Sequence, residues 1–204
     1  MSDTPYFIPA QDVLFEEEIK KSRFLTYISH TVGIKEAKSF IQQIKERHPT
    51  ARHHCWGFIA GRPTDSMKWG FSDDGEPSGT AGKPILAQLS GSGVGELTAV
   101  VVRYSGGIKL GTGGLVKAYG GGVKQGLEQL ETKLKIPQVE LVFSAGYHYS
   151  NLIEQLIEQY QGSMINVDYV IDIHFTLAIP ATKVDDFILE LHNRSRGEIN
   201  IAQD

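Results

Sequence analysis

The chain has 204 residues, 41% of them hydrophobic and 22% charged, a composition that can bury a core and excludes an intrinsically disordered protein. Its N-terminus lacks a basic stretch followed by an apolar run, and no apolar run approaches the roughly 20 residues of a membrane span. Its one cysteine, Cys55, excludes an internal disulfide. We therefore expect a cytoplasmic protein without a membrane partner. The net charge of −4 divides into +3 over residues 1–137 and −7 over residues 138–204, which allows a polyanionic partner for the first part only.

The first part of the chain, residues 1–135, is predicted to form a mixed α/β domain. Runs of β-branched and apolar residues predict strands, and apolar residues spaced three and four apart predict helices. Thr80 is expected to cap a short helix, and a glycine-rich turn precedes a longer one. In chain order the predicted elements are strands Val13–Ile19 and Phe24–His30, helix Ile34–Arg47, strands His53–Ala60 and Met67–Phe71, a helix from Thr80 to Ser90, strand Leu97–Tyr104 and helix Thr112–Lys133.

A domain boundary is expected within Lys133–Gln138, where the helical pattern ends and Pro137 disfavours further helix. Residues 138–204 repeat the order strand, helix, strand, strand, helix, strand, which predicts a ferredoxin-like βαββαβ domain and makes the whole chain an α+β protein. No cluster of reactive groups occurs in this acidic domain, so we expect it to dock to a protein partner. Its predicted elements are strand Val139–Tyr147, helix Tyr149–Tyr160, strands Ser163–Tyr169 and Val170–Ile179, helix Thr182–Ser195 and strand Glu198–Ala202.

Two adjacent histidines, His53 and His54, lie on a predicted strand. Because neighbouring side chains of a strand point to opposite faces, both cannot serve one site without a bulge. A metal site would need one of them together with a carboxylate from the following loop. Alternatively, one histidine packs inside and donates to a backbone carbonyl while the other lies at the surface. Cys55 is expected to be a small buried apolar side chain, and we assign no metal ligand and no cofactor.

The loop Ser72–Pro84 begins with three carboxylates, Asp73, Asp74 and Glu76, and continues with small residues before a helix. The carboxylates could hold a divalent cation or orient a water molecule. The N–H groups of residues 78–80 could instead bind an anion at the helix N-terminus. An ordered surface turn is the third interpretation.

A glycine-rich segment, Arg103–Tyr119, brings together a strand end, a turn and a helix N-terminus, the arrangement that receives phosphate groups. It has the spacing of a P-loop, but Thr112 stands where that motif requires lysine, which disfavours nucleoside triphosphate hydrolysis. Gly120–Gly122 interrupts the helix at a cost of about 1 kcal/mol per glycine. Such glycines are explained by close packing against a neighbouring element, or by a backbone surface kept clear for a partner.

Four segments together resemble the IMPACT family: Lys20–Phe24, His53–Trp56, Ser72–Gly82 and Val100–Gly120. The resemblance covers essentially the whole chain, including the second domain of the bacterial members. It implies a first domain with the left-handed βαβ topology of a ribosomal protein domain and of elongation factor G, and a second domain similar to another elongation factor domain. It therefore implies RNA or the translation machinery as a partner. Ser105 departs from the family, which more often has an aromatic residue there.

The sequence favours a non-enzymatic, translation-associated regulatory protein that binds RNA, the ribosome or a translation factor through a glycine-rich, partly basic cleft. The alternative is an enzyme acting on a phosphorylated or acyl substrate, with Asp73, Asp74 or Glu76 as base or metal ligand beside His53 or His54. A protein-interaction adaptor that works through the acidic domain is a third hypothesis. The first two need the carboxylate loop and the glycine-rich segment to line one cleft. The residues expected to contact the anion or nucleic acid are Lys20, Lys21, Arg23, Ser78, Gly79, Thr80, Lys83, Arg103, Gly106, Gly107, Lys109, Gly111, Gly113 and Lys117.

Overall fold

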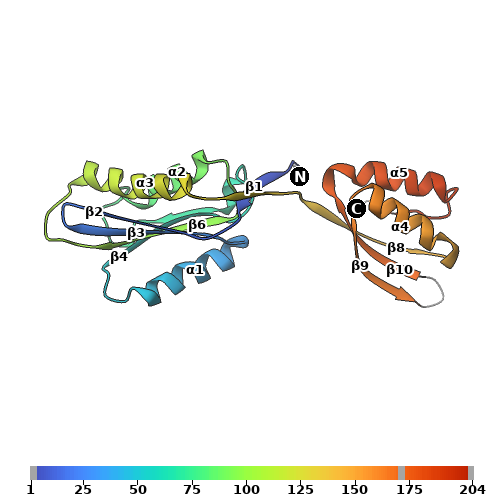
Figure 1. The fold of residues 1–204 in the computed structure, drawn as a ribbon, viewed down its shortest axis with the longest axis horizontal. Coiled ribbons are helices and arrows are strands. Elements are labelled where there is room, and N and C mark those ends of the chain that lie inside the picture. The colour runs from blue at the N-terminus through green and yellow to red at the C-terminus, as the bar shows by residue number, and fades with distance from the viewer. Residues whose placement is uncertain (1–3, 170–172, 202–204) are drawn as a thin grey trace. The chain divides into compact units, whose positions relative to one another are not determined.

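The chain forms two units, each with its own hydrophobic core. The computed structural model describes residues 4–169 and 173–201. One unit spans Tyr6–Lys135 and the other begins at Ile136, in agreement with a two-domain α+β protein (Figure 1). Among the described residues, no helix combines the length and the hydropathy that crossing a membrane requires.

A five-stranded antiparallel sheet is the centre of the first unit. Its strand order is β2-β3-β6-β4-β5, so the central strand β6 pairs with β3 on one side and β4 on the other. All residues of β6 except the last are buried, as its run of apolar residues predicts. The helix α1 connects β3 to β4 across β6. The strands are β2 (Val13–Ile19), β3 (Ser22–His30), β4 (His53–Ile59), β5 (Trp69–Ser72) and β6 (Leu97–Tyr104).

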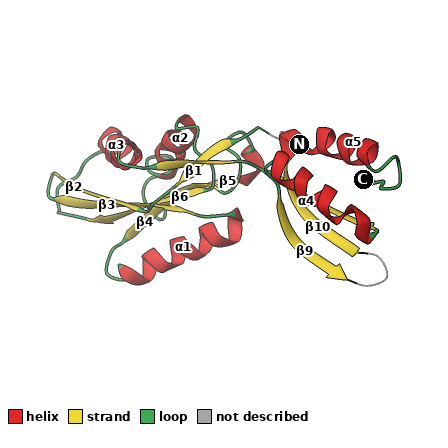
Figure 2. Ribbon diagram, turned by 45° about the vertical axis from the view of Figure 1, so that its right-hand side comes forward, coloured by secondary structure: helices red, strands yellow, loops and turns green. Residues whose placement is uncertain are grey.

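Helices cover both faces of this sheet (Figures 1 and 2). On one face lies α1 (Gly33–Arg47), whose Ala37, Ile41 and Ile44 pack against alternate residues of β6, Val100 and Val102. The other face carries α2 (Gly82–Gly91) and α3 (Thr112–Glu128), packed on the intervening residues of β6. Because successive side chains of β6 point to opposite faces of the sheet, this one strand contributes to the apolar layers on both faces.

The helix predicted to run to Lys133 is shorter than expected, and this prediction was wrong. The helix α3 ends at Glu128, and β7 (Thr132–Lys135) pairs antiparallel with β1 (Tyr6–Pro9), a strand that the sequence did not reveal. Turn-like backbone bonds from Gln129 and Leu130 close the helix. The physical reason for the error is that β1 and β7 are short and stabilise each other across more than 120 residues, which no local pattern shows.

The second unit is a three-stranded antiparallel sheet with two helices on one face (Figure 2). The strand order is β8-β10-β9, and the core includes Phe143, Phe175 and Leu177 of the sheet with Leu156 and Phe187 of the helices. The elements are β8 (Gln138–Ala145), α4 (Ser150–Gln159), β9 (Ser163–Tyr169), β10 (Ile173–Pro180) and α5 (Val184–Arg194), with short 3-10 turns at Tyr147–Tyr149 and Ala181–Lys183 and, in the first unit, at Ser66–Lys68.

The last predicted strand, Glu198–Ala202, is not formed by the described residues 198–201, and Ala202 lies outside them. The backbone N–H groups near this segment donate to nearby residues of the chain and not to a neighbouring strand. The N–H of Gly197 donates to the carbonyl of His192, and the N–H of Ile199 donates to Ser195 Oγ. Ile199 is buried, so the segment adds apolar contact without a strand ladder. Residues 170–172 of the predicted strand Val170–Ile179 also lie outside the described part.

Candidate functional site

Asp73 organises the carboxylate loop through backbone groups. Its Oδ1 accepts hydrogen bonds from the N–H groups of Ala81 and Gly82 at 3.0 and 2.8 Å, and its Oδ2 accepts one from Gly79 at 2.8 Å. Burial raises the pKa of this carboxyl, but the three donors outweigh burial and hold the pKa below its ordinary value. The carboxylate therefore fills the N-terminus of α2 as a bound anion would.

The prediction that Thr80 caps this helix was wrong. The N-cap residue is Ala81, and Thr80 Oγ1 instead donates to the carbonyl of Pro77 at 2.7 Å. Asp73 takes over the capping function from eight and nine residues upstream. A cap at this separation depends on the fold of the loop, so the usual capping signal beside the helix misses it.

Asp74 joins the loop to α1 and β4. Its Oδ1 lies 2.8 Å from Lys45 Nζ, and its Oδ2 accepts the backbone N–H of His54 at 2.8 Å. Burial raises the pKa of Asp74, but Lys45 and the N–H of His54 together lower it below its ordinary value. Both carboxylates of the Asp-Asp pair are thus committed to contacts that shape the loop.

The two histidines lie on opposite faces of the sheet, as predicted. His54 is buried on the α1 face, where its Nε2 donates to the carbonyl of His48 at 3.0 Å. His53 is half-buried on the other face, where its Nδ1 donates to the carbonyl of Asp74 at 3.1 Å. The interpretation that one histidine packs inside and donates to a backbone carbonyl describes His54. His53 makes the same kind of bond nearer the surface.

Cys55 follows these histidines on β4 and is fully buried. Its Sγ donates to the carbonyl of Asp73 at 2.9 Å, and burial raises the pKa of the thiol to about 12. A thiol with this pKa is not a nucleophile at neutral pH.

Glu76 is the centre of a buried polar network. Its Oε1 accepts hydrogen bonds from Arg103 Nη1 and from the hydroxyl of Tyr119, both at 2.7 Å. Arg103 Nη2 lies 3.5 Å from Ser22 Oγ, which also accepts the N–H of Gly106 at 3.2 Å. Burial raises the pKa of Tyr119, so this phenol remains a proton donor to the carboxylate. The network joins β3, β6, α3 and the carboxylate loop.

The glycine-rich segment touches the β2–β3 turn so closely that Gly106 is required there. A Cβ on this residue would lie 1.9 Å from the carbonyl oxygen of Lys21. Lys20 and Lys21 form the turn with positive φ values of 49° and 63°. Two separate motifs are therefore packed together backbone to backbone.

The carboxylate loop and the glycine-rich segment line one cavity of about 260 Å³, which we call the α3 pocket. The helix α3 begins there after Gly111, a residue that has no side chain with which to cap the first turn. Its first N–H groups have no acceptor within the helix, and the helix dipole places partial positive charge at the same point. The lining residues are Glu76, Pro77, Arg103, Lys109, Leu110, Gly111, Thr112 and Leu115.

Arg103 brings a buried positive charge to the α3 pocket. It is only 9% exposed, and its Nε has no hydrogen-bond partner although its two terminal nitrogens do. Buried donors are normally satisfied, so the Nε–H of this pocket-lining side chain is unusual in having no acceptor among the described residues. Lys109 is exposed at the rim.

The other predicted anion contacts are spread more widely. Arg23 lies on the α1 face of the sheet, paired with Glu16 at 3.0 Å, away from the α3 pocket. The N–H of Gly79 is used by Asp73, while Ser78 and Lys83 are exposed and do not line the α3 pocket. Lys117 is exposed on α3 beyond Gly113, and Gly107 is exposed in the turn before the helix. Only Arg103, Lys109 and Gly111 of the predicted set line the pocket.

The residues of the enzyme hypothesis do not converge on one point. Asp73, Asp74 and Glu76 each accept hydrogen bonds from different structural partners. The shortest approach of a histidine ring to one of these carboxylates is 3.7 Å, between His54 Nδ1 and Asp74 Oδ2. Within residues 4–169 and 173–201, no three His, Cys, Asp or Glu side chains are grouped so that they could hold a metal ion.

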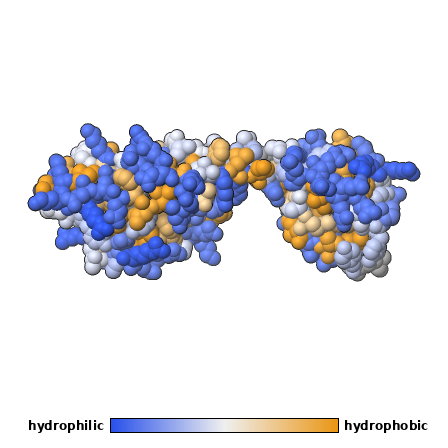
Figure 3. All heavy atoms as spheres, viewed as in Figure 1, coloured by the Kyte–Doolittle hydropathy of each residue, from blue (hydrophilic) through white to orange (hydrophobic). Residues whose placement is uncertain are grey.

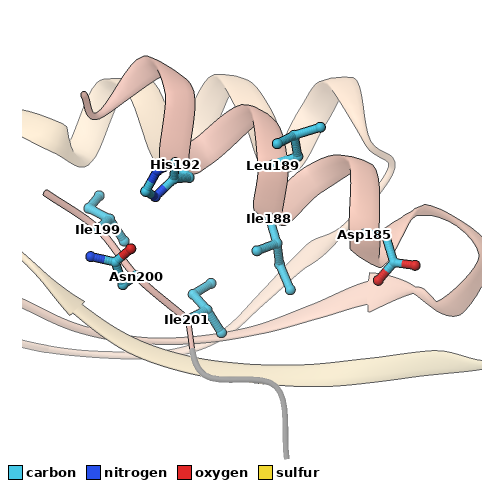
Figure 4. A pocket seen from close by; sticks show the side chains of 7 residues that line it. All are labelled: Asp185, Ile188, Leu189, His192, Ile199, Asn200 and Ile201. Carbon is cyan, nitrogen blue, oxygen red and sulfur yellow. The ribbon is translucent and has the colours of Figure 1, made fainter. Parts of the chain in front are cut away.

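Apolar residues reach the surface of both units between polar ones (Figure 3), as Leu14 and Val142 do. A cavity of about 550 Å³ in the second unit lies between α5 and the chain at residues 199–201, where Ile188 and Ile201 point into the same space (Figure 4). Asp185 and His192 also line it. No arginine lines this cavity and the carboxylate of Asp185 does, so the α3 pocket is the better anion site.

Sequence reasoning missed Tyr119 and Ser22 as site residues. Tyr119 lies seven residues after Thr112, two helical turns along α3, so its side chain falls near the face that carries Leu115. Ser22 alternates with Phe24 on β3, and Phe24 pairs with Arg103 across the sheet. Strand alternation was therefore a usable signal for Ser22, but only once the β3–β6 register was known.

Comparison with known proteins gives consistent matches over both units. Residues 20–127 match the Impact N-terminal domain, and residues 144–198 match a domain of unknown function, DUF1949. The IMPACT family member YigZ of Escherichia coli K12 is 55% identical over 96% of both chains. An IMPACT family member of Haemophilus influenzae is 50% identical over 96% of this chain and 95% of its own length. YvyE of Bacillus subtilis is 33% identical over 97% and 90%. A crystal structure of a hypothetical protein, 54% identical, aligns with a TM-score of 0.78 over 98% of this chain and 97% of that one.

Proposed function

Because the chain belongs to the IMPACT family, we propose that it is a non-enzymatic, cytoplasmic regulator of translation that binds phosphate groups of RNA at the α3 pocket. Family membership supports a translation-related regulatory role, through the resemblance of its domains to those of ribosomal proteins and elongation factors. The acidic second unit is the part that we expect to contact a protein partner.

The observation that carries this proposal is the contrast between the N-termini of α2 and α3, two helices on the same face of the sheet. At α2 the N–H groups are occupied by the Asp73 carboxylate. At α3 no side chain of residues 4–169 and 173–201 takes that place, and Arg103 and Lys109 line the same pocket. The N-terminus of α2 thus binds a carboxylate of the chain itself, whereas the N-terminus of α3 is open to an anion from outside.

Lys109 and Lys117 allow a direct test, because both are exposed and their substitution leaves the core intact. We expect Lys109→Glu/Lys117→Glu to weaken binding of structured RNA at about 0.1 M salt. The slope of log affinity against log salt should fall by about one per lysine, since each phosphate contact releases counterions. Filter binding at several salt concentrations measures both quantities.

The matched control is Lys35→Glu/Lys38→Glu, which makes the same charge change at exposed positions of α1, on the opposite face of the sheet. This variant should retain most of the affinity. Equal loss in both double variants would mean that net charge, rather than the α3 pocket, governs binding. Absence of retention by the wild-type protein at low salt would contradict the proposal.

A further inference from the structure

The α3 pocket is small, and its lining combines positively charged and apolar residues. Its volume of about 260 Å³ is below the 300–1,000 Å³ of pockets that enclose drug-sized ligands. Pro77, Leu110 and Leu115 form the apolar part of the lining. A site of this size takes a small anionic end group, because an internal phosphodiester must also accommodate the chain leaving on both sides.

The positive charge of the α3 pocket attracts a doubly charged anion more strongly than a singly charged one. Donors come from three sources: the uncapped first turn of α3, Lys109, and the guanidinium of Arg103, whose Nε is buried without a partner. Glu76 is paired with Arg103, so the charged side chains of the lining sum to +1, to which the first turn of α3 adds partial positive charge. A phosphate monoester carries about −1.5 to −2 charges at neutral pH, whereas a phosphodiester carries one.

We infer that the α3 pocket binds a terminal phosphate monoester, so that the protein recognises a phosphorylated RNA end rather than the internal backbone. This inference rests on the proposed function, because it specifies which phosphate the RNA presents. The internal backbone would then add only weak, sequence-independent contacts from exposed lysines outside the α3 pocket.

The test uses the full chain and one short single-stranded RNA in three forms: 5′-hydroxyl, 5′-monophosphate and 3′-monophosphate. Fluorescence anisotropy at about 0.15 M salt should show that one phosphorylated form binds at least about tenfold more tightly than the hydroxyl form, the gain of a charge-assisted hydrogen bond. The form that binds identifies the RNA end. A nucleoside monophosphate should compete, and the corresponding nucleoside should not.

Thr112 provides the variants, because it is exposed at the first turn of α3. Thr112→Glu places a carboxylate where the phosphate would bind, and a negative charge at a helix N-terminus does not destabilise the fold. It should abolish the preference for the phosphorylated end. The neutral control Thr112→Gln, of the same size, should keep it.

The outcomes separate the two proposals. Equal binding of all three RNAs would overturn the inference and leave the proposed function standing. A preference that persists in Thr112→Glu would also overturn it, because the end would then be recognised elsewhere. Failure of every RNA to bind would contradict the proposed function itself.

Discussion

At the scale of single residues, carboxylates that look catalytic in the sequence act as structural anions in the fold. Asp73 accepts three backbone N–H groups, and Asp74 binds Lys45 and the N–H of His54. Each interaction replaces water around a partly buried charge with protein donors. Their contribution to stability therefore depends on pH.

Asp73→Asn tests the role of this carboxylate. We expect the free energy of unfolding at pH 7 to fall by about 1–3 kcal/mol, the usual contribution of hydrogen bonds to a charged group. Because the folded-state pKa is lowered, this stabilisation is present above the unfolded pKa of about 4 and is lost as pH falls through the folded value. The difference between wild type and variant should therefore shrink toward about pH 3.

Urea denaturation followed by tryptophan fluorescence measures this effect in the first unit alone, since both tryptophans, Trp56 and Trp69, lie there. The control is Asp65→Asn, which alters one exposed contact, to the N–H of Met67 at 3.2 Å. It should change stability much less. A pH-independent loss in Asp73→Asn would mean that shape rather than charge matters at this position.

At the scale of elements, the triple glycine of α3 has two different explanations. A Cβ on Gly122 would lie 2.7 Å from Thr26 Oγ1 on β3, so this glycine permits close packing of helix on sheet. A Cβ on Gly120 would meet Pro84 of α2 at 3.6 Å, an ordinary contact. A Cβ on Gly121 would meet nothing within 4 Å. Close packing thus accounts for Gly122 and leaves Gly121 as open backbone surface.

Gly121→Ala and Gly122→Ala form a matched pair. Gly121→Ala should raise the stability of the first unit by about 0.5–1 kcal/mol, because alanine favours helix and no neighbour is displaced. Gly122→Ala should lower it, because an overpacking cost of about 1–3 kcal/mol exceeds the helical gain. Thermal denaturation of the two variants should move in opposite directions. Stabilisation of both would show that the helix can shift away from β3.

At the scale of the whole molecule, charge and chemistry are divided between the units. Residues 1–137 carry +3 and contain the α3 pocket, while residues 138–204 carry −7. Each unit has its own core, so each contains the apolar contacts that it needs to fold. RNA binding and protein docking therefore belong to different parts of the chain in the proposed function.

Separating the units tests this division. A chain of residues 6–135 should retain RNA with a salt dependence close to that of the full protein, and residues 136–204 should not retain it. Filter binding of both fragments, each checked by circular dichroism for folding, measures the outcome. If only the acidic fragment retained RNA, the binding surface would lie in the second unit, which would contradict the proposed division.

The sequence by itself determined the elements whose signal is local. The apolar run of β6 and the spacing of Ala37, Ile41 and Ile44 in α1 predict a buried strand and an amphipathic helix, and both are present. Strand alternation likewise placed His53 and His54 on opposite faces. These features follow from the geometry of one segment, so one segment is enough to predict them.

Tertiary structure alone decided the features that join distant segments. Asp73 caps a helix from outside it, β1 pairs with β7 from the other end of the unit, and Tyr119 meets Glu76 across 43 residues. Tertiary structure also decided which carboxylates accept hydrogen bonds from the protein and which helix N-terminus is open to a ligand. The physical reason is that hydrogen bonds and charges act over a few ångströms of space, and only the folded chain fixes which residues share that space.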